Sequence, residues 1–100
     1  MSVPAANPER IARMRALLAT AFDPVELEVI DESHKHVGHA GARDGRGHFT
    51  VVIVSEAFAG KSSLARHRAV YSALGAMMEN DIHALSIRAE TPADKAASAT

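Results

Sequence analysis

The chain contains neither cysteine nor tryptophan, and only four of its 100 residues are aromatic. Without cysteine there are no disulfides, and a soft metal bound here has to use histidine or sulfur from a partner. This composition fits the cytoplasm, which is where we expect the protein. The scarcity of aromatic side chains leaves no stacking platform for single-stranded nucleic acid.

Long apolar runs and a large net charge are also missing. No run approaches the roughly 20 apolar residues that cross a bilayer, and the first residues lack the apolar segment of a signal peptide. The formal net charge of −1 argues against a surface that attracts phosphate as a whole. Hydrophobic residues make up 47% of a length that suits one domain. We therefore expect a single domain over residues 1–100 with no membrane contact.

The hydrophobic pattern predicts a helix, two strands, a second helix and a third strand. Asn7 and Pro8 suit a helix start, as N-cap and first-turn proline. The second strand is apolar on both faces, which predicts a central strand covered on two sides. The predicted elements are a helix over 8–21, a strand over 25–31, a strand over 48–55, a helix from Ser62 or Ser63 to about Asn80, and a strand over 82–90.

These elements predict an α/β fold, an α+β sandwich in which both helices pack on one face of a three-stranded sheet. The core spans about residues 8–90, and the small polar residues of 91–100 predict a flexible tail. We expect the second helix to bury a single stripe of side chains. This stripe consists of Leu64, Val70, Tyr71, Leu74, Met77 and Met78.

A glycine-rich segment from Glu32 to about Gly47 joins the first two strands, and loops of this length in compact domains are usually functional or disordered. Four of the six histidines lie within residues 34–48. The spacing of His34, His36 and His39 can bring two imidazoles to one ion. A structural zinc site needs four ligands, usually with cysteine, and no HExxH motif is present. A self-sufficient zinc site is therefore not favoured, and solvated histidines are the alternative.

The signatures of catalysis are missing as well. The chain has no cysteine nucleophile and no GxSxG motif. Asp31 and Glu32 are adjacent in an extended segment, so their carboxylates point to opposite sides and make a poor acid–base pair. We therefore expect no enzymatic activity.

A basic cluster lies at the start of the second helix, where it is a candidate contact for a partner or for nucleic acid. It consists of Lys61, Arg66, His67 and Arg68. Simple solvation of these side chains is the alternative. The sequence GHAG at 38–41 matches the GXXG loop of nucleic-acid-binding KH domains, but that loop joins two helices, whereas this segment lies between strands.

His83 is the remaining histidine that draws attention. It shares strand parity with Leu85 and Ile87, which predicts that its side chain points to the apolar side of the sheet. A hydrogen-bonded core histidine and a metal ligand are both open interpretations. If the third strand begins near the end of the sheet where the histidine-rich loop emerges, a loop imidazole and His83 can converge on one ion.

Three segments together resemble the BolA family over roughly residues 10–90. They are LEVIDES, HFTVVIVSEAFAGKSSLARHRAVYSAL and IHALSI. The shared signature is a strand ending in VS, then F-x-G, then R-H-R-x-V-Y and, after a spacer, I-H-A-L. The resemblance implies an αββαβ domain with a class II KH-like topology, although the GXXG loop is missing from its usual place.

The resemblance also implies a partner and a cofactor. BolA-like proteins associate with monothiol glutaredoxins as heterodimers and share a bridging [2Fe–2S] cluster. The glutaredoxin supplies a cysteine, glutathione supplies a second sulfur, and the BolA side supplies two ligands. One of these matches His83. The other lies in the loop between the first two strands, where His36 matches best by its distance from the E-S pair and His39 is the alternative.

The implied role is iron–sulfur trafficking or iron homeostasis, with an isolated chain that is monomeric and free of cofactor. Sulfur on one side of the cluster and imidazole on the other is Rieske-like ligation, which raises the reduction potential. His67 belongs to the R-H-R signature and is assigned to packing or partner contact. Some bacterial members are described as transcriptional regulators, so a DNA-binding regulator that uses Lys61, Arg66 and Arg68 is the alternative function.

Overall fold

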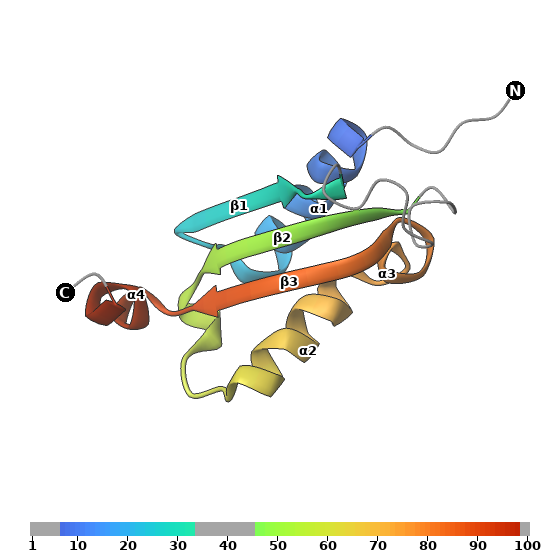
Figure 1. The fold of residues 1–100 in the computed structure, drawn as a ribbon. Helices are drawn as coiled ribbons and strands as arrows, with labels where there is room; N and C mark the ends of the chain where they lie inside the picture. Colours follow the sequence, from blue (N-terminus) through green and yellow to red (C-terminus); the bar gives the residue numbers. More distant parts are fainter. Residues whose placement is uncertain (1–6, 34–45, 99–100) are drawn as a thin grey trace, which may run out of the picture.

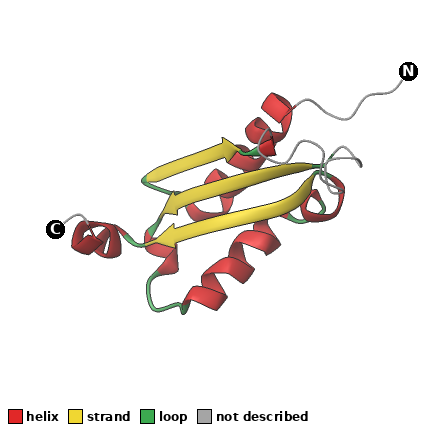
Figure 2. Cartoon of the chain, in the orientation of Figure 1, coloured by secondary structure: helices red, strands yellow, loops and turns green. Residues whose placement is uncertain are grey.

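The computed structural model describes residues 7–33 and 46–98 (Figures 1 and 2). The strands are β1 (Glu26–Asp31), β2 (Gly47–Val54) and β3 (Ile82–Glu90). The helices are α1 (Asn7–Phe22), the 3-10 helix η3 (Glu56–Phe58), α2 (Ser63–Leu74), α3 (Met77–Asn80) and α4 (Pro92–Ser98). The predicted order of helix, two strands, helix and strand is confirmed; the boundaries of α1, β1 and β2 differ from the prediction by one residue, and those of β3 coincide with it.

The strands lie side by side in the order β1-β2-β3, so β2 is central as predicted. The β1–β2 pair is antiparallel, and Glu26 faces Val54 across it. The β2–β3 pair is parallel, which requires a crossover connection. Helices α2 and α3 form this crossover, and it brings the first residues of β2 and β3 to the same end of the sheet (Figure 1).

The hydrophobic core lies between the helices and one face of the sheet, as the sequence predicts. Helix α1 contributes Met14 and Leu18, and α2 contributes Val70 and Leu74. The buried core consists of Met14, Leu18, Phe49, Val51, Ile53, Phe58, Val70, Leu74, Met77 and Ile82. No helix within the described ranges is long and apolar enough to cross a membrane.

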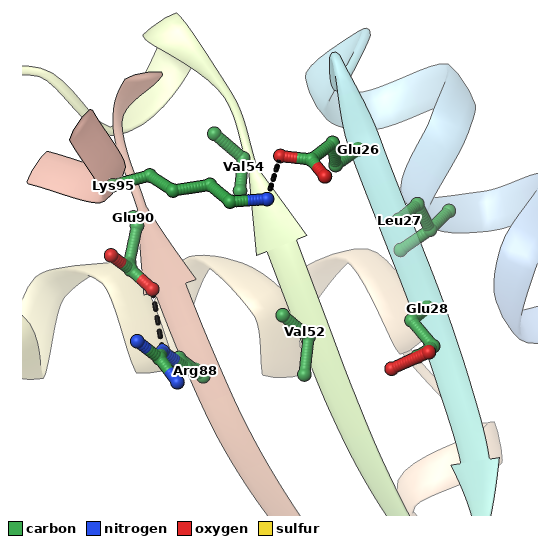
Figure 3. Close-up of a pocket in the computed structure, with 8 residues that line it drawn as sticks. All are labelled: Glu26, Leu27, Glu28, Val52, Val54, Arg88, Glu90 and Lys95. Carbon is green, nitrogen blue, oxygen red and sulfur yellow. Dashed lines mark hydrogen bonds and ion pairs between the residues drawn. The ribbon is translucent and has the colours of Figure 1, made fainter. Parts of the chain in front are cut away.

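The opposite face of β2 corrects the prediction of a strand covered on two sides. Val52 and Val54 lie on this face, between β1 and β3 (Figure 3), and α1 and α2 lie behind the other face of the sheet (Figure 1). Val54 is nevertheless almost fully buried, and Val52 is half-buried. The cover comes from long polar side chains such as Lys95, whose aliphatic stem crosses the strand to an ion pair with Glu26. The apolar residues on the second face of β2 correctly predicted its central position in the sheet. They did not require a second layer of helices.

The long second helix predicted to reach Asn80 is interrupted. Ser62 caps α2 as expected, since its hydroxyl accepts a hydrogen bond from the Ala65 amide. The helix ends before Gly75, whose φ of 56° lies in the left-handed region that glycine tolerates. The expected buried stripe was wrong for Leu64 and Tyr71, which are 59% and 40% exposed, whereas Val70, Leu74 and Met77 are buried as predicted.

Helix α4 was not predicted, because residues 91–100 were interpreted as a tail. The Thr91 hydroxyl accepts a hydrogen bond from the Asp94 amide, and the Asp94 carboxylate accepts one from the Thr91 amide. This reciprocal pair is a capping box followed by proline at the first helical position. The signal T-P-A-D was therefore present in the sequence. Arg66 also binds Asp94, at 2.7 Å, and this contact comes first among the causes that lower the pKa of the Asp94 carboxyl.

Both edge strands of the sheet have a backbone carbonyl that is bound by an arginine from a helix. Arg15 of α1 donates to the Leu27 carbonyl of β1 at 3.1 Å. Arg66 of α2 donates to the Ala89 carbonyl of β3, also at 3.1 Å. These bonds fasten each helix to the edge strand beneath it and occupy an acceptor that otherwise faces outward.

Candidate functional site

Two histidines meet at the end of the sheet where β2 and β3 begin. The ring centroids of His48 and His83 are 5.1 Å apart, and the ring planes are tilted by 51°. His48 is the second residue of β2 and His83 is the second residue of β3. Arg46, immediately before β2, approaches the same place, with Nη2 at 3.3 Å from Nδ1 of His83. Parallel pairing of two strands distant in sequence thus assembles a pair of imidazoles.

A register shift places His83, and it corrects the prediction that this side chain points into the apolar side. Gly47 pairs with Ile82, whereas His48 pairs with Ala84, so His83 is an extra residue in β3. Such a bulge breaks the alternation of faces along a strand and re-aims a side chain. The parity shared with Leu85 therefore does not hold across the bulge, and His83 is exposed.

The backbone amide and carbonyl of His48 are both hydrogen-bonded to the residues that directly follow β1. Its carbonyl accepts a hydrogen bond from the Glu32 amide at 2.8 Å. Its amide donates to the hydroxyl of Ser33 at 3.0 Å. The residue is 8% exposed, and both of its ring nitrogens are out of contact with solvent. His48 is thus a fixed, buried neighbour of an exposed histidine.

The start of β3 is anchored by Asp81. Its carbonyl accepts a hydrogen bond from the Gly47 amide at 2.9 Å, which joins the first residues of β2 and β3. Its carboxylate binds Arg10 Nε at 3.2 Å and Arg13 Nη1 at 3.6 Å, both from α1. Arg10 is almost fully buried, whereas Arg13 is exposed. The position of the two histidines therefore depends on an ion pair with the first helix.

Gly47 has no room for a side chain at this point. A Cβ built on it would lie 2.6 Å from an atom of the Phe49 ring and 2.9 Å from the Ser33 hydroxyl. Because Phe49 is a core residue and Ser33 holds His48, neither neighbour can move without disturbing the site. Glycine is required here for close packing beside the bulge.

The basic cluster predicted at the start of α2 is divided between free and engaged side chains. Lys61 and Arg68 are exposed, and His67 is half-buried. Arg66 is turned toward the protein, where it donates to the Lys61 and Ala89 carbonyls and pairs with Asp94. Of the four residues predicted from the sequence, Lys61 and Arg68 are therefore available to a partner, whereas Arg66 is engaged within the protein.

The two loop histidines predicted as ligands, His36 and His39, lie outside the described residues. His48 was counted among the clustered histidines but was not singled out as a candidate. Its position could have drawn attention to it, because His48 directly precedes Phe49, the first core residue of β2, and so lies at the start of that strand. Among residues 7–33 and 46–98, no group of three or more potential metal-ligating histidine, aspartate or glutamate side chains is present.

The described surface also has a groove at the other end of the sheet, away from the histidines (Figure 3). Val52 and Val54 form its floor. Charged side chains of β1, β3 and α4 surround it and bind one another, as in the pairs Lys95–Glu26 and Arg88–Glu90. It contains none of the residues predicted as ligands or partner contacts.

Comparison with known proteins identifies the family. A family model described as BolA-like protein matches residues 18–94, most of the chain. The chain belongs to the BolA family. It is 43% identical over 79 residues to the DNA-binding transcriptional regulator BolA of Escherichia coli, with 79% of this chain and 72% of that protein covered.

Some relatives in the BolA family are longer proteins. The chain is 49% identical over 87 residues to SufE-like protein 1 of Arabidopsis thaliana, which covers 82% of this chain but 24% of that protein. The chain thus spans about a quarter of the length of this relative. The solved BolA domain of SufE1 from the same plant superimposes with a TM-score of 0.76 at 50% identity, over 84% of this chain and 93% of that one. The expected BolA fold is confirmed.

Proposed function

We propose that this BolA-family protein is the heterodimeric partner of a monothiol glutaredoxin and co-ligates a bridging [2Fe–2S] cluster in iron–sulfur trafficking or iron homeostasis. The observation that carries the proposal is the exposed His83, re-aimed by a bulge and set beside His48. The chain has no cysteine. Any cluster held here must therefore take its sulfur ligands from elsewhere, which a glutaredoxin and glutathione provide.

The donor set fits half of such a site. Imidazole replaces thiolate on one iron of a Rieske-type cluster. His83 offers one imidazole at the surface, where a partner can reach it. The second ligand of the proposal is His36, with His39 as the alternative. When bound, the cluster supplies one-electron redox chemistry and iron with sulfide for transfer.

The described residues prepare His83 for this role in three ways. The bulge presents its ring to solvent, the Asp81 carbonyl fixes the start of its strand against Gly47, and buried His48 lies against the ring. Lys61 and Arg68 are exposed and remain our candidates for partner contact, with His67 beside them. The proposal includes a cytoplasmic protein without enzymatic activity that is monomeric before it meets its partner.

The test is whether this protein becomes a ligand of a cluster that has been assembled on a glutaredoxin. A cluster assembled on a monothiol glutaredoxin with glutathione is mixed with this protein, and visible absorption and circular dichroism are recorded. We expect new bands with the wild-type chain and no change with His83→Ala. We expect His36→Ala to remove most of the response, or His39→Ala to do so if the alternative ligand is the true one.

A matched control separates ligation from folding. Ser86→Ala removes another exposed side chain of β3, three residues further along, and should leave the new bands intact. The amide spectrum of each free variant establishes that it is folded. Spectra that do not change with the wild-type chain, or a response that survives in folded His83→Ala, would overturn the proposal.

A second candidate function is DNA binding, favoured by the name of the Escherichia coli relative and by the exposed Lys61 and Arg68. Each phosphate neutralised contributes about −0.9 to the slope of log K against log salt. Because Arg66 is engaged with Asp94, we expect a shallow slope, reduced by about one on replacing either exposed residue by alanine. Absence of a shift with promoter DNA at low salt, by fluorescence anisotropy, would exclude this function.

A further inference from the structure

The pair His48–His83 has the spacing of two ligands of one metal ion. With metal–nitrogen bonds of about 2.0–2.1 Å and tetrahedral angles, two imidazole rings on one ion have centroids about 5 Å apart. The observed separation is 5.1 Å, and the ring planes are tilted rather than stacked. Neutral imidazole suits borderline divalent metals such as Zn²⁺ and Cu²⁺. Both rings are carried by strands of the sheet.

One histidine of the pair is buried and the other is exposed, and each property favours the binding of an ion in its own way. His48 is 8% exposed and held through its backbone by Glu32 and Ser33, so its ring loses little freedom when it binds. His83 is exposed, so an ion can arrive from solvent and keep water in its remaining positions. With only two protein ligands, such a site would be more open than a catalytic zinc site, which has three, and water would complete the coordination.

Arg46 competes with a metal ion for the ring of His83. A guanidinium only donates hydrogen bonds, so the contact of Arg46 Nη2 with Nδ1 of His83 uses the lone pair of Nδ1. In the neutral ring the proton then lies on Nε2. A metal bound at Nδ1 replaces the arginine directly. A metal bound at Nε2 moves the proton to Nδ1, which then has no lone pair for the arginine. Ligation through either nitrogen breaks this contact.

We propose that His48 and His83 form a two-imidazole site for a borderline divalent transition-metal ion, with Arg46 as an intramolecular competitor for His83. The site belongs to the isolated chain and needs neither a glutaredoxin nor a cluster. Its ligands come from the starts of β2 and β3, and the third and fourth positions of the ion are open to water. Arg46 lowers the affinity of the free chain for such an ion without touching it.

The proposal is tested by titrating the isolated, metal-free protein with Zn²⁺ and following the imidazole nitrogens by ¹⁵N NMR. We expect the ring signals of His48 and His83 to change together and to saturate at one ion per chain. His83→Ala and, separately, His48→Gln should abolish this saturable change, while their amide spectra remain those of a folded protein. A variant lacking both His36 and His39 should bind as the wild type does.

Replacing Arg46 provides a second test, in which the affinity for Zn²⁺ should rise. Arg46→Gln should bind Zn²⁺ about tenfold more tightly, the scale of a change beside a metal ligand. A folding defect cannot mimic a gain in affinity. Arg88→Gln removes an exposed arginine from the other end of β3 and should leave the affinity unchanged. The proposal is overturned if neither the wild type nor Arg46→Gln binds, if folded His48→Gln binds as the wild type does, or if loss of His36 and His39 abolishes binding.

Because no glutaredoxin is present, this outcome is independent of the proposed function. Loss of Zn²⁺ binding in His48→Gln with an intact cluster response means that His48 serves only the metal site of the free chain. A cluster response that fails while Zn²⁺ still binds overturns the glutaredoxin proposal and leaves the metal site standing.

Discussion

Replacing Asp81 by alanine should lower the free energy of unfolding by about 3–5 kcal/mol, the usual cost of breaking a buried ion pair. Its carboxylate binds Arg10, whose side chain is only 5% exposed. The guanidinium stays buried in the variant and loses its ion pair with the Asp81 carboxylate, which offsets the cost of removing it from water. Urea unfolding at neutral pH measures the loss.

Arg13 provides the matched control, because it binds the same carboxylate from an exposed position. Exposed ion pairs contribute about 0–1 kcal/mol, so Arg13→Ala should cost no more than that. Asp81→Asn keeps the shape of the side chain and removes its charge, and most of the loss should persist. If Asp81→Ala costs no more than Arg13→Ala, the buried pair does not stabilise the fold.

The same substitution has a consequence at the histidines. The Asp81 carbonyl binds the Gly47 amide, so a looser start of β3 frees the neighbouring bulge. We expect the imidazole NMR signals of His48 and His83 to be broader in Asp81→Ala than in the wild type, under conditions in which the signals of the sheet core are unchanged. Stability and site geometry are linked here through one residue.

Phe58→Ala should destabilise the protein by about 3–5 kcal/mol, the range for truncating a buried aromatic residue. Phe58 is fully buried, and its ring centroid is 4.9 Å from that of Phe22 at the end of α1. It lies in η3, a single turn capped by Ser55, whose hydroxyl accepts from the Ala57 amide. A turn this short contributes little by itself, so the aromatic anchor provides most of its attachment.

The comparison for this prediction is Val25→Ala, which truncates an apolar side chain that is 66% exposed and should change stability by less than about 0.5 kcal/mol. Phe58→Leu keeps most of the apolar volume and should cost less than about 1.5 kcal/mol. Thermal and urea unfolding of the three variants give the order. Equal costs for Phe58→Ala and Val25→Ala would show that the ring is not an anchor.

The strands and the first helix could be predicted because their patterns are local. Alternating or continuous apolar residues mark β1 and β2, and Asn7-Pro8 marks the start of α1. The break at Gly75 was missed because the apolar spacing continues across it, and the left-handed backbone is visible only in the structure. Helix α4 was missed because its residues are small and polar, although its capping box was legible.

The site could be predicted only in part. A resemblance in the I-H-A-L segment pointed to His83, but the direction of its side chain depends on a one-residue shift between strands that no local pattern encodes. The proximity of His48 depends on the same register. Arg46 carried no signal at all, since its role comes from its contact with His83. Pairing of distant strands decides these features, and sequence periodicity does not describe it.

The parallel pairing of β2 with β3 also has a kinetic consequence. The two strands are separated in sequence by the whole crossover, so their contact forms only after a long loop has closed, an entropically costly step. We therefore expect the two histidines to come together only once the crossover brings β3 beside β2. A nascent or partly denatured chain keeps them apart, and so offers a passing metal ion no preformed chelate until folding is complete.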